Sequence, residues 1–278
     1  MQKYIEKVEI LIEALPYIKK FRGKKVVVKY GGSTLAMEGI KRSIMQDLIF
    51  MHTVGIMPVL VHGGGPLITE KLKQMGKKTE FIDGMRATDK ESLAIVEDVL
   101  FKEINRGLVD LIKQLGGKAG SINGKDFIQA SIHNEELGLV GKVKKINPEI
   151  IIKKKNLIPV ISPLGADKKQ ILNVNADVVA GELAVALKAE KLVLLTDVKG
   201  IMRNSEDETS LLSTLKCDEA DDLIKNNIIA RGMIPKVGAC IAAIKGGVKK
   251  AHIVDGRLPH SILLEIFTDK GIGTEIVR

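Results

Sequence analysis

Apolar runs of strand length alternate with longer segments of helical period along most of the chain. The runs lie at residues 25–30, 56–62, 157–162, 191–197 and 251–255. Strands that are apolar throughout are typical of a sheet covered on both faces, and their alternation with helices is typical of parallel strands. The pattern therefore predicts an α/β fold, a three-layer αβα sandwich around a mainly parallel open sheet.

The pattern changes between residues 118 and 146. This segment contains the short runs KAGSI, FIQASIH and LGLVGKVKKI, separated by Asn123-Gly124 and other turn signals. Short runs joined by tight turns are typical of β-hairpins. We therefore expect a β-hairpin flap beside the main sheet.

The first twenty residues predict a separate helix ahead of the first core strand. Ile5, Val8, Ile12 and Leu15 share one helical face, and Pro16 is expected to kink or break the helix. The pattern fits a helix packed on the fold and equally an arm that joins subunits. We expect three parts that share one continuous sheet: an oligomerisation helix at 1–22, an N-lobe at 23–170 and a C-lobe at 171–278.

The composition is that of a soluble globular protein, because 45% of the residues are hydrophobic, 28% charged and 3% aromatic. The charged N-terminus is unlike a secretory signal, and no apolar run approaches the roughly 18 residues of a membrane span. Cys217 and Cys240 form no CxxC motif, so we expect neither a metal site nor a disulfide framework. These features favour a cytoplasmic protein with no membrane partner.

A net charge of +9 raises the question of a nucleic-acid partner. The positive residues are mostly lysines scattered singly or in short runs, such as KVKK at 142–145 and KKK at 153–155. Scattered charge without stacking aromatic residues is typical of a solvated surface, so we expect no nucleic-acid partner. Small anionic substrates remain compatible with this charge.

Two glycine-rich stretches each follow an apolar strand. They are KYGGS at 29–33 and HGGGP at 62–66. At the carboxyl ends of parallel strands such loops present backbone N–H groups to an anion, although a single glycine pair is more often a tight turn. Neither stretch has the GxGxxG or GxxxxGK[ST] spacing of the common nucleotide loops.

Six motifs in a fixed order resemble those of the amino acid kinase family. They are KYGGS (29–33), VHGGGP (61–66), DGMRATD (83–89), NVNAD (173–177), LLTDVKG (194–200) and RGMIPK (231–236). The resemblance runs from about residue 20 to the end and points to the branch that acts on N-acetyl-L-glutamate in the second step of arginine biosynthesis. It implies transfer of the γ-phosphoryl of ATP to the γ-carboxylate of that substrate, with Mg²⁺ carried by the nucleotide.

The resemblance assigns catalytic roles to Lys29, Lys236 and Asp177. The two lysines would stabilise charge on the transferring phosphoryl from opposite sides, and Asp177 would hold them in place. Phosphoryl transfer between two anions depends mainly on positioning and positive charge, so these residue types suit the reaction. Without the resemblance, each lysine would be read as a surface residue and Asp177 as the cap of the following helix.

The resemblance also implies the binding residues. Arg86 offers a planar fork suited to an α-carboxylate, although its motif departs from the usual NGxRVT at Asp83 and Ala87. Arg231 stands where many relatives have a small or acidic residue, and His62 is read as a hydrogen-bonded support without a part in proton transfer. The substrate-binding set is Gly64, Gly65, Arg86, Asn173 and Asn175, and the ATP- and phosphate-binding set is Gly31, Gly32, Gly63, Thr196, Asp197, Gly232 and Met233.

Both ends of the chain resemble the arginine-inhibited, hexameric branch of the family. In that branch N-terminal helices interlace between dimers, so the resemblance implies a trimer of dimers. It also implies arginine as an effector near residues 260–276, with Glu265, Gly271 and Gly273 at its site; an ordinary terminal helix and edge strand is the alternative. Whether a PII-type signalling protein binds is left open.

Three other functions remain as alternatives. The chain could be an amino acid kinase that acts on glutamate, aspartate, carbamate or a nucleoside monophosphate. It could instead be a non-catalytic nucleotide or arginine sensor of the same fold, although such a sensor has no need of Lys29, Lys236 and Asp177 together. A basic nucleic-acid binder is the third and would bind with steep salt dependence.

Overall fold

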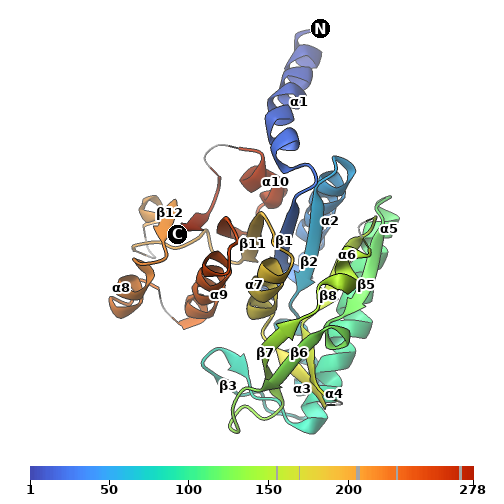
Figure 1. Ribbon diagram of the computed structural model, residues 1–278, viewed down its shortest axis with the longest axis vertical. Coiled ribbons are helices and arrows are strands. Elements are labelled where there is room, and N and C mark those ends of the chain that lie inside the picture. Colours follow the sequence, from blue (N-terminus) through green and yellow to red (C-terminus); the bar gives the residue numbers. More distant parts are fainter. Residues whose placement is uncertain (155, 169, 205–206, 230, 269–270) are drawn as a thin grey trace.

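An eight-stranded sheet forms the centre of the computed structural model, which describes residues 1–154, 156–168, 170–204, 207–229, 231–268 and 271–278 (Figure 1). Neighbouring strands from β13 to β5 are all parallel, while β14 runs antiparallel to β13 and parallel to β12. In order across the sheet they are β12 (Thr214–Lys216), β14 (Thr274–Val277), β13 (Lys250–Asp255), β11 (Lys191–Thr196), β1 (Lys25–Tyr30), β2 (Met57–His62), β8 (Ile158–Ser162) and β5 (Ala119–Asn123).

Helices cover both faces of the sheet. Val26 and Val28 of β1 pack with α2 (Glu38–Thr53), α5 (Arg106–Gln114) and α10 (Ser261–Ile266), whereas Val27 packs with α7 (Ala176–Ala186) and α9 (Ile234–Lys245). Alternate residues of one strand thus enter opposite apolar layers, which is why the strands are apolar throughout. The predicted three-layer αβα sandwich is confirmed, together with all five of its predicted strands.

A small closed barrel lies beside the sheet. It is built from β6 (Ile128–Ile132), β7 (Val140–Ile146), β9 (Leu164–Asp167) and β10 (Gln170–Val174). The antiparallel pair β6 and β7 confirms the expected hairpin. The run KAGSI was wrongly placed in that flap: it forms most of β5, because Ala119 and Ile122 pack into opposite layers of the sandwich, as in a strand of the main sheet.

The segment before β5 is one long helical stretch. It comprises α4 (Lys90–Glu97), a π-helical part η2 (Asp98–Asn105) and α5. Ahead of it, β3 (Phe81–Ile82) and β4 (Met85–Arg86) form a two-residue hairpin in which Asp83 and Gly84 have φ of 49° and 77°. Asp-Gly is a preferred pair for such a turn, which gives the unusual Asp83 a structural reason. The other helices are α3 (Gly65–Gln74), α6 (Glu149–Ile152), α8 (Ala220–Lys225) and the short turns η1 (Gly32–Ala36), η3 (Gly124–Asp126), η4 (Glu208–Ser210) and η5 (Arg231–Met233).

The first helix, α1 (Gln2–Phe21), extends away from the rest of the chain (Figure 1). It continues through Pro16, so the helix is not broken there, and a kink at Pro16 stays a prediction. Its last turn packs on the fold through Tyr17 and the buried Phe21. Ile18 is half-buried, and the large apolar residues of the helix before Tyr17 are exposed, namely Tyr4, Ile5, Val8, Ile10, Leu11, Ile12 and Leu15.

Within the residues that the structure describes, no helix is both long enough and apolar enough to cross a membrane.

Candidate active site

A cavity of about 260 Å³ opens where β1 and β2 end. Ligands bind at this edge in open α/β sheets, because loops and helix N-termini converge there. Most of the residues that the sequence singled out lie around it, from stretches far apart in the chain. They are Lys29, Gly32, Gly63, Gly64, Gly65, Arg86, Asn173, Asn175, Asp177 and Lys236.

Two lysines face one carboxylate inside this cavity. Lys29 Nζ lies 3.0 Å from Asp177 Oδ1, and Lys236 Nζ lies 3.1 Å from Asp177 Oδ2. Burial of Asp177 acts to raise its pKa, but the two ammonium groups outweigh burial and hold the pKa of this carboxyl below its ordinary value. The sheet and two helices thus place an ionised carboxylate that fixes two positive charges at one side of the cavity.

The N-cap of α7 is Asn175, two residues before Asp177. Asn175 is extended, and its Oδ1 accepts hydrogen bonds from the backbone nitrogens of Asp177 at 2.8 Å and Val178 at 3.3 Å. The alternative interpretation of Asp177 as the cap is therefore wrong, because the capping position and its donors are already taken. The Asp177 carboxylate is left to the two lysines.

The two glycine loops meet beside the lysines. Gly63 N donates a hydrogen bond to Tyr30 O over 2.7 Å, and a Cβ on Gly31 would lie 3.2 Å from Gly63 Cα. A Cβ on Gly64 would lie 2.7 Å from Leu100 Cδ2, whereas one on Gly65 would meet nothing within 4 Å. Glycine at 31 and 64 therefore allows backbone and helix to pack closely, while Gly65 begins α3 in open space.

Arg86 reaches the cavity from β4. Its Nη2 donates to Gly65 O at 2.9 Å and to Thr69 Oγ1 at 2.8 Å, and its guanidinium carbon lies 4.6 Å from the centroid of the Phe81 ring. Its Nη1 is buried and has no hydrogen-bond partner within the described parts of the chain. A buried cationic donor without a partner is costly, so the geometry suits an anionic ligand at this point.

Asn173 lies near the end of β10 and lines the cavity. Its Nδ2 donates a hydrogen bond to Thr88 Oγ1 over 3.2 Å, and its backbone N donates to Leu139 O. Thr88 Oγ1 in turn donates to Arg86 O over 2.8 Å. The barrel strand and the arginine hairpin are thereby linked through buried polar groups.

Of the residues expected to bind ATP and its phosphates, Gly32 and Gly63 line the 260 Å³ cavity, whereas Gly31, Thr196, Asp197, Gly232 and Met233 are not among the residues that line it. Thr196 ends β11, where its Oγ1 donates to Val198 O over 2.9 Å, and Asp197 is exposed directly after it. Gly232 is exposed and Met233 is half-buried, both just before α9, whose Lys236 does reach the cavity. The side chain of Arg231 lies outside the described residues. Because β11 lies next to β1 and runs parallel to it, Thr196 and Asp197 lie at the same edge of the sheet as the end of β1.

Residues 24–255 match the sequence profile of the Amino acid kinase family. The chain belongs to the amino acid kinase family. Curated relatives of this kinase are similar over their whole length. The acetylglutamate kinase of Heliobacterium modesticaldum is 49% identical and covers 100% of both chains, and that of Moorella thermoacetica is 51% identical and covers 98% of each.

A solved structure of N-acetylglutamate synthase from Neisseria gonorrhoeae, complexed with coenzyme A and N-acetyl-glutamate, shares the kinase's fold with a TM-score of 0.86 and 27% identity. The alignment covers 98% of this chain but 63% of that one. The same protein complexed with coenzyme A and L-arginine aligns with a TM-score of 0.81 and 26% identity, over 97% of this chain and 65% of that one. This kinase therefore spans somewhat less than two thirds of the synthase.

Asn105 of this kinase, which no sequence motif indicates, contacts His62 at the start of the HGGGP loop. His62 is fully buried, and the prediction that it is a hydrogen-bonded support is confirmed, because its Nδ1 lies 3.0 Å from Gly63 O. Its Nε2 lies 3.1 Å from Nδ2 of Asn105, which is also fully buried and ends the π-helical stretch. The only sequence signal for Asn105 is a single amide among the apolar positions of a helical segment.

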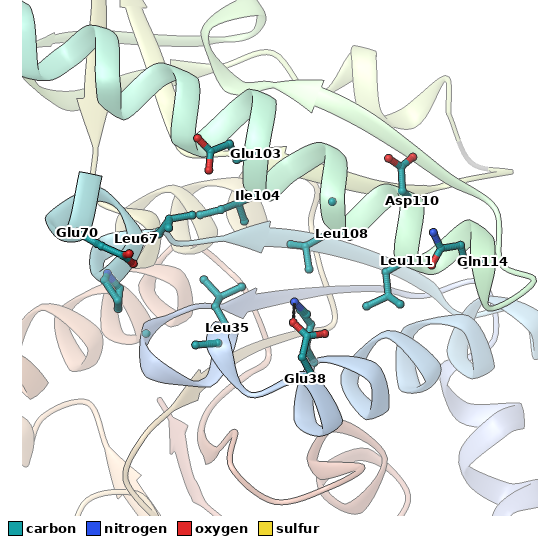
Figure 2. A pocket seen from close by; sticks show the side chains of 16 residues that line it. Leu35, Glu38, Leu67, Glu70, Glu103, Ile104, Leu108, Asp110, Leu111 and Gln114 are labelled. Carbon is teal, nitrogen blue, oxygen red and sulfur yellow. Dashed lines mark hydrogen bonds and ion pairs between the residues drawn. The ribbon is translucent and has the colours of Figure 1, made fainter. Parts of the chain in front are cut away.

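A larger cavity of the kinase, about 640 Å³, lies behind the same loop (Figure 2). Gly32, Gly64 and Pro66 line both cavities. Figure 2 shows the side chains of Leu35, Ile104, Leu108 and Leu111 directed into it, and four acidic residues are also among those that line it. These acidic residues are Glu38, Glu70, Glu103 and Asp110. No sequence pattern indicates this cavity, because it forms between elements that are distant in sequence.

The residues expected to bind the effector arginine, Glu265, Gly271 and Gly273, lie together near the C-terminus of the kinase. Glu265 is buried in α10, with Oε1 2.6 Å from His252 Nδ1, and Oε2 accepts a hydrogen bond from Ile272 N over 2.9 Å. A Cβ on Gly271 would lie 2.8 Å from Glu265 Oε1, and one on Gly273 would lie 2.1 Å from Ile253 O. Glycine at both positions lets the loop pass close to the carboxylate and to β13.

Proposed function

We propose that the chain transfers the γ-phosphoryl group of ATP to the γ-carboxylate of N-acetyl-L-glutamate, the second step of arginine biosynthesis, in the cytoplasm. The observation that carries this proposal is the pair of lysines fixed by Asp177 at the cavity of the two glycine loops. Full-length relatives named acetylglutamate kinase support the choice of acceptor.

The charges of the site suit a reaction between two anions. The acceptor carboxylate is already ionised near pH 7, so the step needs no general base. Lys29 and Lys236 offset the negative charge that gathers on the transferring phosphoryl group, and backbone N–H groups of the glycine loops point at its oxygens. Asp177 acts by keeping the two ammonium groups apart and in place.

The binding of N-acetyl-L-glutamate falls to the other side of the cavity. The unpartnered Nη1 of Arg86 is the donor for the α-carboxylate, and Asn173 and Asn175 line the space beside it. Nucleotide binding is assigned to Thr196, Asp197, Gly232 and Met233, along the neighbouring edge of the sheet.

Mg²⁺ enters this proposal with the nucleotide. Among the described residues that line the cavity, Asp177 is the single carboxylate, and both of its oxygens face lysines. The described part of the chain also holds no group of three His, Cys, Asp or Glu side chains arranged to bind a metal ion. The donor set therefore fits a cation held by the phosphates of ATP, which supplies further charge neutralisation.

The test is ATP-dependent acyl-phosphate formation, trapped with hydroxylamine. N-acetyl-L-glutamate, glutamate, aspartate and carbamate are offered side by side, with Lys29→Ala and Lys236→Ala as controls. We expect turnover of N-acetyl-L-glutamate alone, lost in both variants. Turnover of another acceptor would overturn the substrate, and ATP binding without any turnover would favour a sensor.

Arginine inhibition and assembly into a hexamer, a trimer of dimers, complete the proposal. The exposed apolar side chains of α1 suit burial between subunits. Glu265 is the proposed partner of the arginine cation, and the synthase solved with L-arginine supports an arginine site in this fold. Arginine in the millimolar range should inhibit turnover, and Glu265→Gln should weaken the inhibition; activity unaffected by arginine would contradict the proposed site.

A further inference from the structure

A chain of buried polar groups runs beneath the HGGGP loop. Ser121 Oγ donates a hydrogen bond to Asn105 Oδ1 over 2.5 Å, and Asn105 Nδ2 donates to Val160 O over 2.9 Å. Asn105 Nδ2 also lies 3.1 Å from His62 Nε2, and His62 Nδ1 lies 3.0 Å from Gly63 O. His62 and Asn105 are both fully buried, so water cannot reach their polar atoms. These contacts therefore supply the hydrogen-bond partners that both side chains need.

This chain of contacts fixes the tautomer of His62. The carbonyl oxygen of Val160 can only accept, so the nitrogen of the Asn105 amide must face it and also face His62 Nε2. His62 Nε2 is then the acceptor, which leaves the proton on Nδ1 to donate to Gly63 O. Burial lowers the pKa of His62 to about 4, so the ring stays neutral at pH 7.

The hydrogen bond to Gly63 O fixes the peptide plane that follows. The described chain contains no cis peptide bond, so the N–H of Gly64 points opposite to the carbonyl of Gly63. The carbonyl is directed down toward the buried ring of His62, and the N–H of Gly64 is therefore directed away from it. Gly63 and Gly64 both line the cavity that contains Lys29, Asp177 and Lys236.

The π-helical stretch puts Asn105 where it can make this contact. Along α4 and η2 the buried side chains include Val96, Leu100 and Asn105, and the step of five residues from 100 to 105 corresponds to one π-turn. Leu100 and Ile104 of the same stretch lie where a Cβ on Gly64 would be. The stretch thus contacts the loop on two sides, through packing against Gly64 and through Asn105 and His62.

We infer that His62 and Asn105 are positioning residues for phosphoryl transfer, which hold the Gly63–Gly64 peptide so that the Gly64 N–H faces the oxygens of the reacting groups. Neither side chain touches the reactants. This inference rests on the proposed function for its kinetic consequence, but the hydrogen-bond geometry beneath it does not depend on the substrate.

The kinetic test compares His62→Asn with His62→Gln. An asparagine amide nitrogen can take the place of Nδ1 and donate to Gly63 O, but it cannot reach Asn105; a glutamine can accept from Asn105 but loses Gly63. Loss of one preorganised donor costs about 10²–10³ in kcat, so we expect a fall of about 10- to 100-fold in His62→Gln, where the donor is misaligned but present. His62→Asn should keep kcat within about threefold by the same reasoning, with little change in KM in either variant.

Thermal unfolding separates positioning from folding in this comparison. Both variants lose one buried hydrogen bond and the ring, so their unfolding midpoints should fall by similar amounts. Equal kcat in the two variants would overturn the inference, because the loss would then follow stability and not the bond to Gly63.

A spectroscopic test reads the geometry directly. In the full chain labelled with ¹⁵N-histidine, the NMR signals of the His62 ring are the ones that are absent from the spectrum of His62→Asn. At pH 7 these signals should show the neutral tautomer protonated at Nδ1. Asn105→Asp would place a carboxylate against Nε2 and should shift the ring to the doubly protonated form. A ring protonated at Nε2 alone in the wild-type chain would overturn the inference. If the wild type turned over no acceptor, the proposed function would fail while this measurement still decided the geometry.

Discussion

At the scale of single residues, the site depends on a buried charge that is balanced twice. Asp177 is 4% exposed, and an ionised carboxylate at that depth is stable only beside positive groups. Lys29 and Lys236 supply them, from β1 and α9. The same pairing that keeps the carboxylate ionised keeps two ammonium groups in the cavity, so stability and positioning of charge have one origin here.

Replacement of Asp177 by asparagine tests that common origin. Asp177→Asn should lower kcat at least about 100-fold, since two lysines lose the group that holds them. It should also lower the free energy of unfolding by about 3 kcal/mol, the low end for a broken buried pair, because the Lys236 side chain is 22% exposed and partly screened. Steady-state kinetics and urea unfolding measure the two effects, with the exposed Asp110→Asn as a control that should change neither.

The acid dependence of the same comparison has a defined sign. The folded-state pKa of Asp177 is lowered, so its stabilisation is present above the ordinary carboxylate pKa near 4 and is lost as the pH falls through the folded value. The difference in unfolding free energy between wild type and Asp177→Asn should therefore be constant near neutral pH and shrink below about pH 4. A difference that persists unchanged at pH 2 would show that the lost charge is not its source.

Arg86 allows a prediction about substrate affinity. Its Nη2 is engaged with Gly65 and Thr69, and its Nη1 is the buried donor left for a ligand. Arg86→Lys keeps the charge but loses the fork, and a hydrogen bond to a charged group is worth about 1.5–3 kcal/mol, so KM for N-acetyl-L-glutamate should rise about 10- to 100-fold. Initial rates at saturating ATP measure this, and an equal rise in KM for ATP would contradict the assignment.

At the scale of elements, the glycine loop and the helix behind it form one unit. The loop is held from the sheet by the Tyr30 carbonyl and from the helix by Leu100 and Ile104. Its glycines are consequently not equivalent, although the sequence shows three in a row.

The two glycines 64 and 65 give a matched pair for thermal unfolding. Gly64→Ala would bring a Cβ within 2.7 Å of Leu100 and 2.9 Å of Ile104, and overpacking of this kind costs about 1–3 kcal/mol. Gly65→Ala adds a methyl group in open space at the first turn of α3, where alanine is a better helix former. We expect a clear fall in the unfolding midpoint for the first variant only; similar midpoints would mean that the helix moves away freely.

Elements also show what the sequence could and could not predict. The strands carrying Lys29 and His62 were predictable, because apolar continuity follows from burial on both faces, and the family motifs then located Asp177 and Lys236. The edge strand β5 was not, since five residues with two glycine or serine positions resemble a turn-rich hairpin. The contact of Asn105 with His62 joins residues that are 43 apart in the sequence. It also depends on a π-turn, which the spacing of apolar residues along the chain does not reveal.

At the scale of the whole molecule, the first part of α1 is not packed against the rest of the fold. The sheet and its two helical layers bury nearly all strand residues, yet the described side chains of residues 1–13 are exposed, several of them large and apolar. Only the last turns of α1 pack on the fold. The exposed apolar side chains of residues 1–13 are the surface that the proposed hexamer would bury between subunits.

Deletion of residues 1–13 should reduce the number of chains per assembly in solution without loss of the fold. Val8→Lys with Ile12→Lys should act in the same direction, because both apolar side chains are exposed and would be buried between subunits. Light scattering after size-exclusion chromatography gives the mass of the assembly, and Glu9→Gln with Glu13→Gln is a control because it changes the net charge by the same +2 without touching an apolar side chain. An unchanged number of chains per assembly in the deletion variant would exclude the helix from the contact.

The π-helical stretch has a consequence for how this chain tolerates changes in its length. Loss of one residue from 98–105 would convert it to a regular helix, in which the same rotation about the helix axis takes about one residue fewer. The half that packs against the Gly64 loop and the half that packs against the sheet would then keep their faces, and the bulged residues, Asn105 among them, would lose their places. The same deletion within α2, which is α-helical throughout, would instead turn everything after it by about 100°.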